Sequence, residues 1–323
     1  MDAYPLITPG TFTLVDPMDK ALKHHRWVDK KERGSTWTIR FMILLCQHKY
    51  RWLVNALLHP IVLYFLLTAG KTRKASRRFF ISATGKYSWT DHYDQLLCFS
   101  RSLVDRVSIL MGESCQFDIH SEGREQLINA RKQGRGFILL GAHLGNFEAC
   151  KMLIKDRAEI DIHIVAYFGG SQKIRNQLDA LNPKLNHHII DPTDPDAVFQ
   201  MRDVIENGGI LAILGDRTGI GEKKLRIDFL GEAADLPAGP YFLASILRCP
   251  IYCFFGLRAG ENLYHTYIHR LADKVRLRRH CREEDAQRYA QAYADLLAAK
   301  ARQYPNNWFN FFDFWESTQD DHP

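Results

Sequence analysis

The sequence lacks several patterns that mark common enzyme classes. No serine stands in a G-x-S-x-G turn, so a hydrolase that works through an acyl-serine has no evident nucleophile. No H-E-x-x-H is present, which removes the commonest zinc peptidase pattern. Gly70-Lys71-Thr72 resembles the end of a P-loop, but Phe65 holds the position where that pattern needs its first glycine. A P-loop is therefore not expected. The glycine-rich segment 214–224 lacks the spacing of a dinucleotide-binding motif, so a nicotinamide site is not expected either.

Cysteines are few and scattered. The chain of 323 residues has seven, an odd number without the spacing of a disulfide framework. They stand in apolar segments such as 41–46 and 251–255, which predicts reduced thiols in a protein that faces the cytosol. Cys249 and Cys253 flank Pro250 with no second pair nearby, so we expect them to pack in the core rather than bind a metal. No metal and no resident cofactor is predicted.

A long uninterrupted apolar run is missing too. Residues 1–35 are polar and lack the charged-then-apolar design of a signal peptide, so we expect a loosely ordered arm. The longest apolar stretch, residues 52–69, is interrupted by Asn55, His59 and Pro60. It falls short of the roughly 20 apolar residues that a clean membrane span requires.

Residues 36–90 nevertheless favour membrane association. Residues 37–46 are apolar as well, and a cationic cluster follows the longer apolar stretch. The cluster consists of Lys71, Arg73, Lys74, Arg77 and Arg78. Apolar helices that end in cations, with Trp37, Trp52 and Tyr64 for the lipid interface, predict a monotopic or hairpin membrane attachment that faces the cytoplasm. The alternative is a buried helical hairpin in a soluble protein, with the cluster as a solvated surface.

The moderate positive net charge favours acidic binding partners. The formal charge is +6 and the pI is near 8.9. These moderate values suit an anionic membrane surface or an acidic carrier protein. No RNA-binding or DNA-binding signature is present, so nucleic acid is not an expected partner.

Apolar patterns with helical and strand periods alternate from residue 91 onward. We expect helices at 91–112, 122–132, 196–206, 241–247 and 283–302, and strands at 117–120, 137–140, 160–168, 189–190, 210–214, 250–258 and 264–268. Alternating strands and helices predict an α/β domain over residues 91–318, with a mixed, mostly parallel central sheet flanked by helices.

The best chemical candidate is the turn that follows the strand at 137–140. Asn146 is a good N-cap, which places His143 in the loop and Glu148 in the first turn of the next helix. A turn after a buried strand is where α/β sheets place their ligands. His143 can act as a general base, and Glu148 can orient the imidazole and stabilise its charged form. Because no protein nucleophile is evident, the nucleophile belongs to the substrate, which favours a transferase.

A second candidate is the glycine-rich segment 214–224, at the end of another predicted strand. Arg217, Lys223 and Lys224 offer cations to a phosphate or carboxylate, although the segment could also be a solvated loop. Arg175 and Arg217 are candidates to stabilise an oxyanion. Asn146, Arg175, Asp216 and Arg217 are the predicted substrate-binding residues.

Two further segments are distinctive but less specific. Residues 228–240 end in Pro237-Ala238-Gly239-Pro240 before an apolar helix, and these residues could fix a loop against an acyl chain or could cap that helix. Residues 304–315 hold a dense set of aromatic side chains. We expect them to pack against the domain with an edge at the membrane interface.

Together these motifs resemble the lysophospholipid acyltransferase superfamily, within it the late acyltransferases of lipid A biosynthesis, which include lauroyl and myristoyl transferases. The resemblance runs from about residue 37 to residue 315. It rests on the H-x4-E pattern of His143 and Glu148, the strand-end Asp216-Arg217, the F-x-G…G-P pattern of Phe229, Gly231, Gly239 and Pro240, and the P-x-x-W-F of Pro305, Trp308 and Phe309. Two segments look more like the related proteins that are associated with aryl polyene or other specialised-lipid gene clusters. They are the N-terminal set Trp27, Glu32, Arg33 and Gly34 and the C-terminal Asn-Trp-Phe-Asn-Phe.

The resemblance implies transfer of a fatty acyl group from a thioester to a hydroxyl or amine of a membrane lipid or glycolipid. The donor would be acyl carrier protein or coenzyme A, with the acidic carrier favoured. Two other classes stay open from the residues: a thioesterase or lysophospholipase in which His143 activates water, and a non-catalytic lipid-binding protein.

Overall fold

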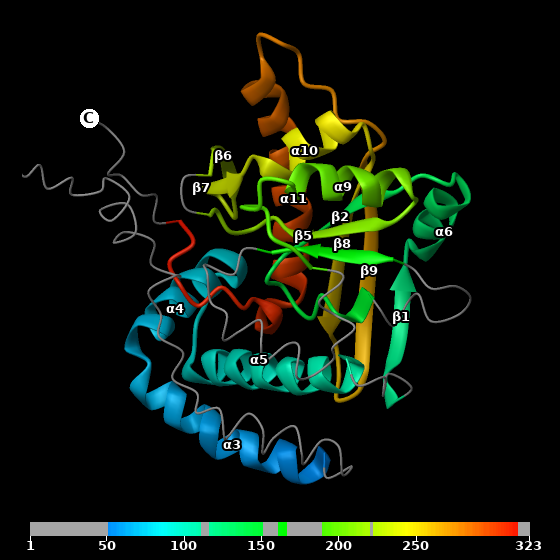
Figure 1. The fold of residues 1–323 in the computed structure, drawn as a ribbon. Helices are drawn as coiled ribbons and strands as arrows, with labels where there is room; N and C mark the ends of the chain where they lie inside the picture. Colours follow the sequence, from blue (N-terminus) through cyan, green and yellow to red (C-terminus); the bar gives the residue numbers. More distant parts are fainter. Residues whose placement is uncertain (1–50, 111–115, 151–160, 167–188, 220–221, 316–323) are drawn as a thin grey trace, which may run out of the picture. The chain divides into compact units, whose positions relative to one another are not determined.

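The computed structural model of the chain describes residues 51–110, 116–150, 161–166, 189–219 and 222–315 (Figure 1). A seven-stranded sheet is its main feature, with strand order β1-β9-β8-β2-β5-β3-β4. The strands are β1 (Asp118–Glu122), β2 (Phe137–Gly141), β3 (Ile162–Val165), β4 (Ile189–Ile190), β5 (Ile210–Leu214), β8 (Ile251–Arg258) and β9 (Leu263–Ala272). Every neighbouring pair is parallel except β8 and β9. The prediction of a mixed, mostly parallel sheet is confirmed.

Strand β2 lies at the centre of the sheet, with three strands on each side. All five of its residues are buried, because parallel neighbours β5 and β8 flank it and both faces of the sheet are covered. A strand buried on both faces needs a continuous apolar run rather than an alternating one, which is what residues 137–140 supply. Phe137 and Leu139 join one hydrophobic cluster, while Ile138 and Leu140 join another.

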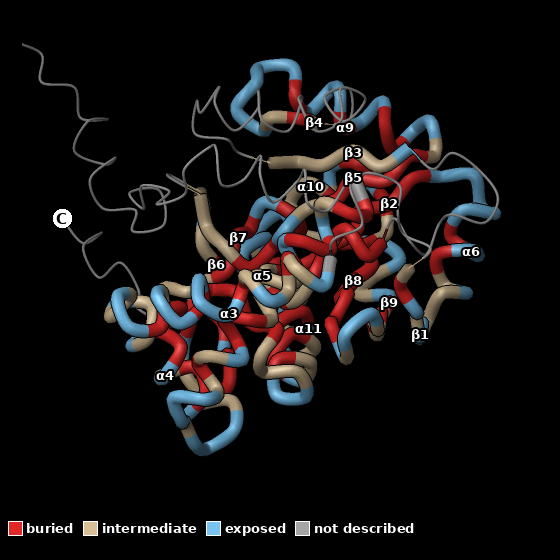
Figure 2. Tube along the Cα trace, turned by 90° about the horizontal axis from the view of Figure 1, so that it is seen from below, coloured by how far each residue is buried: buried red, intermediate tan, exposed pale blue. Residues whose placement is uncertain are grey.

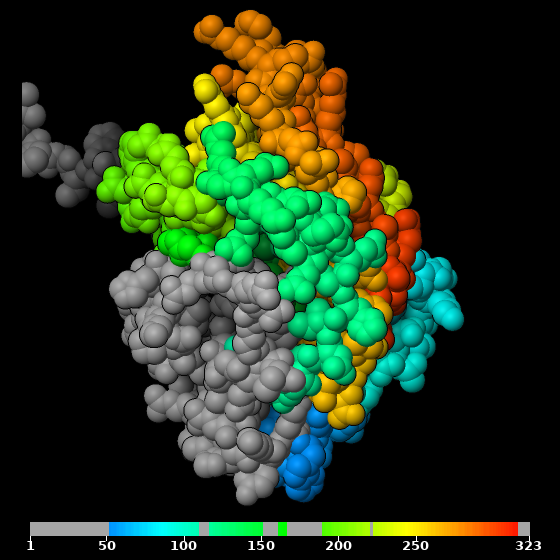
Figure 3. Space-filling view, turned by 90° about the vertical axis from the view of Figure 1, so that its right-hand side faces the viewer, coloured from blue at the N-terminus to red at the C-terminus, as the bar shows by residue number. Residues whose placement is uncertain are grey.

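Helices cover both faces of the sheet (Figures 1 and 2). They are α3 (Arg51–Thr68), α4 (Gly70–Thr84), α5 (Trp89–Leu110), α6 (Arg124–Lys132), α9 (Ala197–Glu206), α10 (Gly239–Leu247) and α11 (Arg282–Gln303). The larger cluster combines α9, α10 and α11 with the sheet, and the smaller one uses α6 and the end of α5. The segment between β9 and α11, orange in Figure 3, projects from the surface. Each helix and strand expected from residue 91 onward has a counterpart of the same type in the described part of the chain, with most boundaries shifted by one to three residues. Two strands between residues 224 and 237 were not expected, and residues 160, 167 and 168 of the strand expected at 160–168 lie outside the described residues.

The segment at 228–240 forms a hairpin and a helix start. Strands β6 (Lys224–Phe229) and β7 (Glu232–Pro237) pair in an antiparallel sheet of their own. Leu230 and Gly231 make the turn with positive φ angles of 58° and 88°, a conformation that glycine favours. Pro240 stands in the first turn of α10, so the helix-capping alternative is the one observed.

Helix α3 is apolar on two sides. One stripe at helical spacing packs on α5: Val54, Leu58, Val62 and Leu66. Side chains on other faces, including Trp52, Leu63, Tyr64 and Leu67, are at least half exposed. Within the described residues, no single helix has the length and apolar composition to cross a bilayer. The pair formed by residues 52–68 and α4, bent by 91°, meets both criteria only when taken together.

The aromatic C-terminal segment, residues 304–315, packs into the protein. Trp308 is fully buried, and its ring stacks on Phe79 of α4 at 5.0 Å and on Phe229 of β6 at 5.3 Å between centroids. The Trp315 indole donates a hydrogen bond to the carbonyl oxygen of Phe229. Packing of this segment against the domain is therefore confirmed, and it connects the N-terminal helices to the hairpin.

Candidate active site

The ends of β2 and β5 bring the two main site residues together. These parallel strands pair in register, with Gly141 opposite Leu214. His143 and Asp216 each lie two residues beyond those positions, so they leave the same edge of the sheet side by side. Carboxyl ends of parallel strands are the usual ligand-binding edge of α/β sheets.

Gly145 allows the turn after β2 to pass close to β8. Its φ angle is +78°, and a Cβ there would lie 2.3 Å from the carbonyl oxygen of Gly256. The next amide, of Asn146, donates a hydrogen bond of 2.7 Å to that same carbonyl oxygen. Only glycine fits this conformation and this clearance, so the turn is fixed on β8 as well as on β5.

Asp216 holds His143 through both of its carboxylate oxygens. Oδ1 lies 2.9 Å from the Nδ1 of the His143 ring, and Oδ2 accepts a hydrogen bond of 2.9 Å from the His143 backbone N–H. Because an ionised carboxylate only accepts hydrogen bonds, Nδ1 carries the proton and the basic lone pair of the neutral ring is on Nε2. The His143 side chain is 28% exposed, so a substrate can reach it.

The surroundings of Asp216 keep it ionised although it is buried. Burial opposes its ionisation, but the charge and hydrogen bond of His143, the charge of Arg217 and a hydrogen bond from Asn310 together hold its pKa at about 2. A carboxylate that stays charged can stabilise the imidazolium formed when His143 accepts a proton. The pair has the arrangement of a general base and its orienting acid.

The sequence analysis assigned that orienting contact to Glu148, and here it is made by Asp216. Glu148 is buried at the start of the following helix, where its Oε1 accepts a hydrogen bond of 3.1 Å from Nη2 of Arg106 on α5. The Asn146 side chain caps this turn, since its Oδ1 accepts a hydrogen bond from the Glu148 N–H. The predicted cap is confirmed. The Glu148 carboxylate therefore faces Arg106 on α5, while the strand register places Asp216 beside the imidazole.

Arg217 contacts the C-terminal segment. Its Nε donates a hydrogen bond of 2.8 Å to Oδ1 of Asn310, and its guanidinium lies over the Phe312 ring. Burial lowers the pKa of Arg217, against the opposing charge of Asp216. Of the other cations predicted in this segment, Lys223 pairs with Glu283 at the surface. Arg175 lies outside the described residues.

The C-terminal segment forms one wall of the turn, which the sequence analysis missed. The Phe309 N–H donates to the His143 carbonyl oxygen, and the Gly145 N–H donates to the Asn307 carbonyl oxygen, both at 2.8 Å. The Asn310 side chain then donates a hydrogen bond of 2.7 Å to Oδ2 of Asp216. Asparagines within an aromatic segment were the one available signal, because a buried amide needs polar partners.

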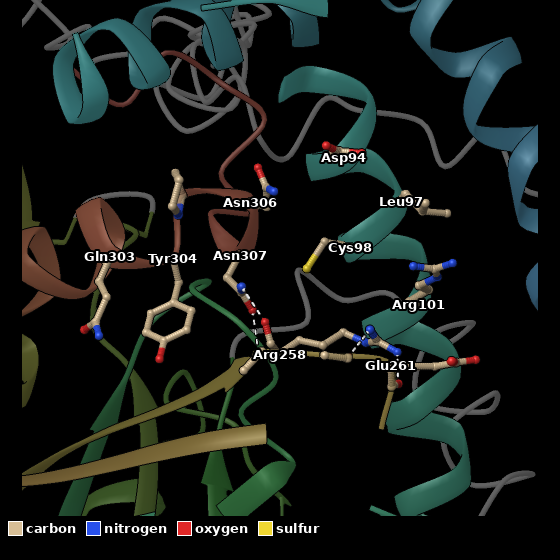
Figure 4. A pocket seen from close by; sticks show the side chains of 13 residues that line it. Asp94, Leu97, Cys98, Arg101, Arg258, Glu261, Gln303, Tyr304, Asn306 and Asn307 are labelled. Carbon is tan, nitrogen blue, oxygen red and sulfur yellow. Dashed lines mark hydrogen bonds between the residues drawn. The ribbon is translucent and has the colours of Figure 1, made fainter. Parts of the chain in front are cut away.

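A cavity of about 530 Å³ has Asn307 in its lining (Figure 4). Its walls come from α5, the turn between β8 and β9, and residues 303–307. The Asn307 side chain hydrogen-bonds to both the N–H and the carbonyl oxygen of Arg258 at its edge. Of the described residues that the sequence analysis placed in the site, none lines this cavity. Asn307 connects the cavity to the turn, because its carbonyl oxygen accepts a hydrogen bond from the Gly145 N–H.

The sequence also matches a known protein family. The model of the family described as bacterial lipid A biosynthesis acyltransferase matches residues 102–317, which is about two thirds of the chain. No curated protein matches. The matched region contains His143, Glu148, Asp216 and the C-terminal wall of the turn. A match of this extent shows that the chain belongs to the bacterial lipid A biosynthesis acyltransferase family.

Proposed function

We propose that this acyltransferase moves a fatty acyl group from a thioester donor to a hydroxyl or amine of a membrane lipid or glycolipid, with His143 as general base. The observation that carries the proposal is the pair of hydrogen bonds that Asp216 accepts from the ring and the backbone of His143. It fixes the tautomer in which Nε2 accepts a proton. The absence of a serine in a nucleophile-elbow motif supports direct attack by the acceptor.

The reaction then needs two proton transfers, one from the acceptor to His143 and one from His143 to the leaving thiolate. Nε2 of His143 takes the proton from the acceptor as its oxygen or nitrogen attacks the thioester carbonyl, which gives a tetrahedral oxyanion. When that intermediate collapses, the carbon–sulfur bond breaks and the imidazolium returns its proton to the departing thiolate. Asp216 stays ionised throughout and stabilises the charged imidazole. No covalent acyl-enzyme is needed.

We assign different parts to the other predicted residues. Glu148 supports the turn from the α5 side through Arg106, and Asn146 caps the same turn. Arg217 supports Asp216 through Asn310, because its Nε hydrogen bond is committed to that amide. Arg175 is kept as a candidate for contact with the oxyanion or the acceptor.

The surface of α3 and α4 supports attachment to the cytoplasmic face of the inner membrane. Exposed apolar side chains on α3 stand next to a cationic cluster on α4, in which Lys71 and Arg77 are exposed. Arg78 is not available for lipid, since it pairs with Glu232 and Asp313. An apolar surface with adjacent cations is typical of monotopic attachment to anionic lipid. The same positive balance favours an acidic acyl carrier protein over coenzyme A as donor.

The proposal is tested by incubating the purified chain, in detergent with a bacterial lipid extract, with an acyl-thioester that carries an isotopic label. We expect labelled acyl-lipid by mass spectrometry and a loss of roughly 10²–10⁴-fold in its rate of formation for His143→Ala. Labelled free fatty acid without acyl-lipid would instead show a thioesterase. A rate unchanged by His143→Ala would contradict the mechanism.

A further inference from the structure

We propose that Asn310 is a positioning residue that completes the active site from the C-terminal segment, by holding Asp216 in the orientation that serves His143. The inference rests on the proposed role of the His143–Asp216 pair. It also makes the aromatic segment at 304–315 part of the catalytic apparatus rather than only a core plug.

The two hydrogen bonds of Asn310 require a side chain that both donates and accepts. Arg217 Nε can only donate, so it must face the carbonyl oxygen Oδ1, at 2.8 Å. An ionised Asp216 can only accept, so it must face the amide Nδ2, at 2.7 Å. One small side chain that donates in one direction and accepts in the other satisfies both neighbours. Among side chains of this length, an ionised aspartate lacks the donor and leucine lacks both groups.

Burial makes these contacts costly to lose. Asn310 and Asp216 are each 1% exposed, so water does not replace a missing partner readily. A buried polar group left without its partner costs more than a typical hydrogen bond gains. Without Nδ2, the Oδ2 of Asp216 keeps only the His143 N–H, and the carboxylate is less firmly held against the imidazole.

The register of the C-terminal segment places Asn310 where it is needed. Leu144 and Trp308 form an antiparallel bridge between this segment and the turn at residues 142–148, which carries His143 and is called the catalytic turn below. Hydrogen bonds on either side of that bridge join Gly145 to Asn307 and His143 to Phe309. The residue after Phe309 therefore emerges beside Asp216. The stacking of Trp308 between Phe79 and Phe229 fixes this register from the core.

The sharpest test is Asn310→Asp, because a protonated aspartate has the same shape and hydrogen-bonding pattern as asparagine. Its O–H would donate to Asp216 and its carbonyl oxygen would accept from Arg217. Besides Asp216, Arg217 contacts Asn310 directly. His143 and Tyr293, whose hydroxyl donates to the carbonyl oxygen of Gly141, interact with Asp216. Burial and the negative charge of Asp216 both raise the pKa of the introduced carboxyl group, against the lowering effect of Arg217, so the asparagine-like form exists below that raised pKa and is lost as pH rises.

We therefore expect the ratio of the variant's kcat to that of the wild type to fall about tenfold between about pH 5 and pH 8, with KM little changed. The thermal stability of the variant relative to the wild type should fall in the same direction. Two controls from the same segment separate this from general damage. Asn306→Asp adds a carboxylate that does not touch Asp216, and Asn307→Ala removes a different buried amide. Neither control should show this dependence on pH.

The proposal would be overturned if the kcat of Asn310→Asp relative to the wild type did not change with pH. It would also be overturned if this relative kcat had the same pH dependence as that of Asn306→Asp. If Asn310→Asp does not fold, Asn310→Ser decides: its kcat should fall about tenfold more than that of Asn307→Ala at equal thermal stability, and an equal fall would overturn the inference. The pH dependence of thermal stability needs no turnover. It therefore separates failure of this inference from failure of the proposed reaction.

Discussion

The catalytic turn and the α3–α4 surface differ in where their key contacts come from. At the turn, His143 depends on a carboxylate 73 residues away and on an amide of the C-terminal segment. At the α3–α4 surface, neighbouring residues on two consecutive helices supply both the exposed apolar side chains and the cations. The active site is thus a product of the tertiary fold, while the surface is a product of local composition. Substitutions should reveal this difference, since we propose that contacts in the first region act on turnover and those in the second on membrane binding.

Next to the His143–Asp216 pair itself, a large effect on turnover is expected at the edge of the catalytic turn. Arg106→Gln removes the charged donor that holds the buried Glu148, and we expect kcat to fall about tenfold. Arg106→Lys should lie between that variant and the wild type. Steady-state rates with an acyl-thioester and a lipid extract measure this directly.

Arg202→Gln is the matched control for that prediction. Arg202 and Glu206 form an exposed pair on α9, away from the turn, and exposed pairs contribute little. If both arginine variants lost activity equally, the loss at Arg106 would be a general effect of charge, and the turn would not depend on α5.

A smaller effect concerns acid stability. The ordinary pKa of an aspartate is 3.8, and that of Asp216 in the folded protein is about 2. A depressed pKa gives stability that is present above pH 3.8 and lost as pH falls toward 2. Asp216→Asn should therefore flatten the fall in thermal stability between about pH 4 and about pH 2. An unchanged slope would show that Asp216 is not held as an anion by His143 and Asn310.

The smallest expected effect on turnover is at the α3–α4 surface. Replacing Trp52, Leu63 and Leu67 together by serine should reduce flotation with anionic vesicles about tenfold, because exposed apolar area drives insertion into the lipid interface. Turnover with detergent-dispersed acceptor should stay within about twofold of the wild type.

Ile246→Ser is the control for that surface, since this residue of α10 is 66% exposed and lies outside α3 and α4. It should leave flotation unchanged. Equal loss of flotation by both variants would mean that the apolar side of α3 has no special part in membrane binding.

The same difference explains what could be predicted from the sequence. Apolar runs indicated β2, β5 and β8 because strands buried on both faces must be apolar throughout, and the long amphipathic pattern indicated α11. His143 and Asp216 were both selected because each follows such a strand. Their pairing was not visible, since it depends on β2 and β5 being neighbours in the sheet.

Arg106 and Asn310 were missed for the same physical reason. Arg106 lies 42 residues from Glu148, and Asn310 lies 94 residues from Asp216, on elements whose packing is decided by the whole core. The H-x4-E spacing favoured Glu148 as the partner of His143 because it is the nearest carboxylate along the chain. Tertiary packing placed a more distant carboxylate on the imidazole.

We propose that Asp216 orients His143 and stabilises its charged form. The kcat of the Asp216→Asn variant tests this role directly. Asp216→Asn keeps the size of the side chain but allows the amide to select the wrong tautomer of the imidazole. We expect kcat for acyl transfer to fall on the order of 10²–10⁴-fold, in a variant that remains folded at neutral pH by circular dichroism. If Asp216→Asn kept kcat within about threefold of the wild type, another group would be orienting His143, and this account of the site would be wrong.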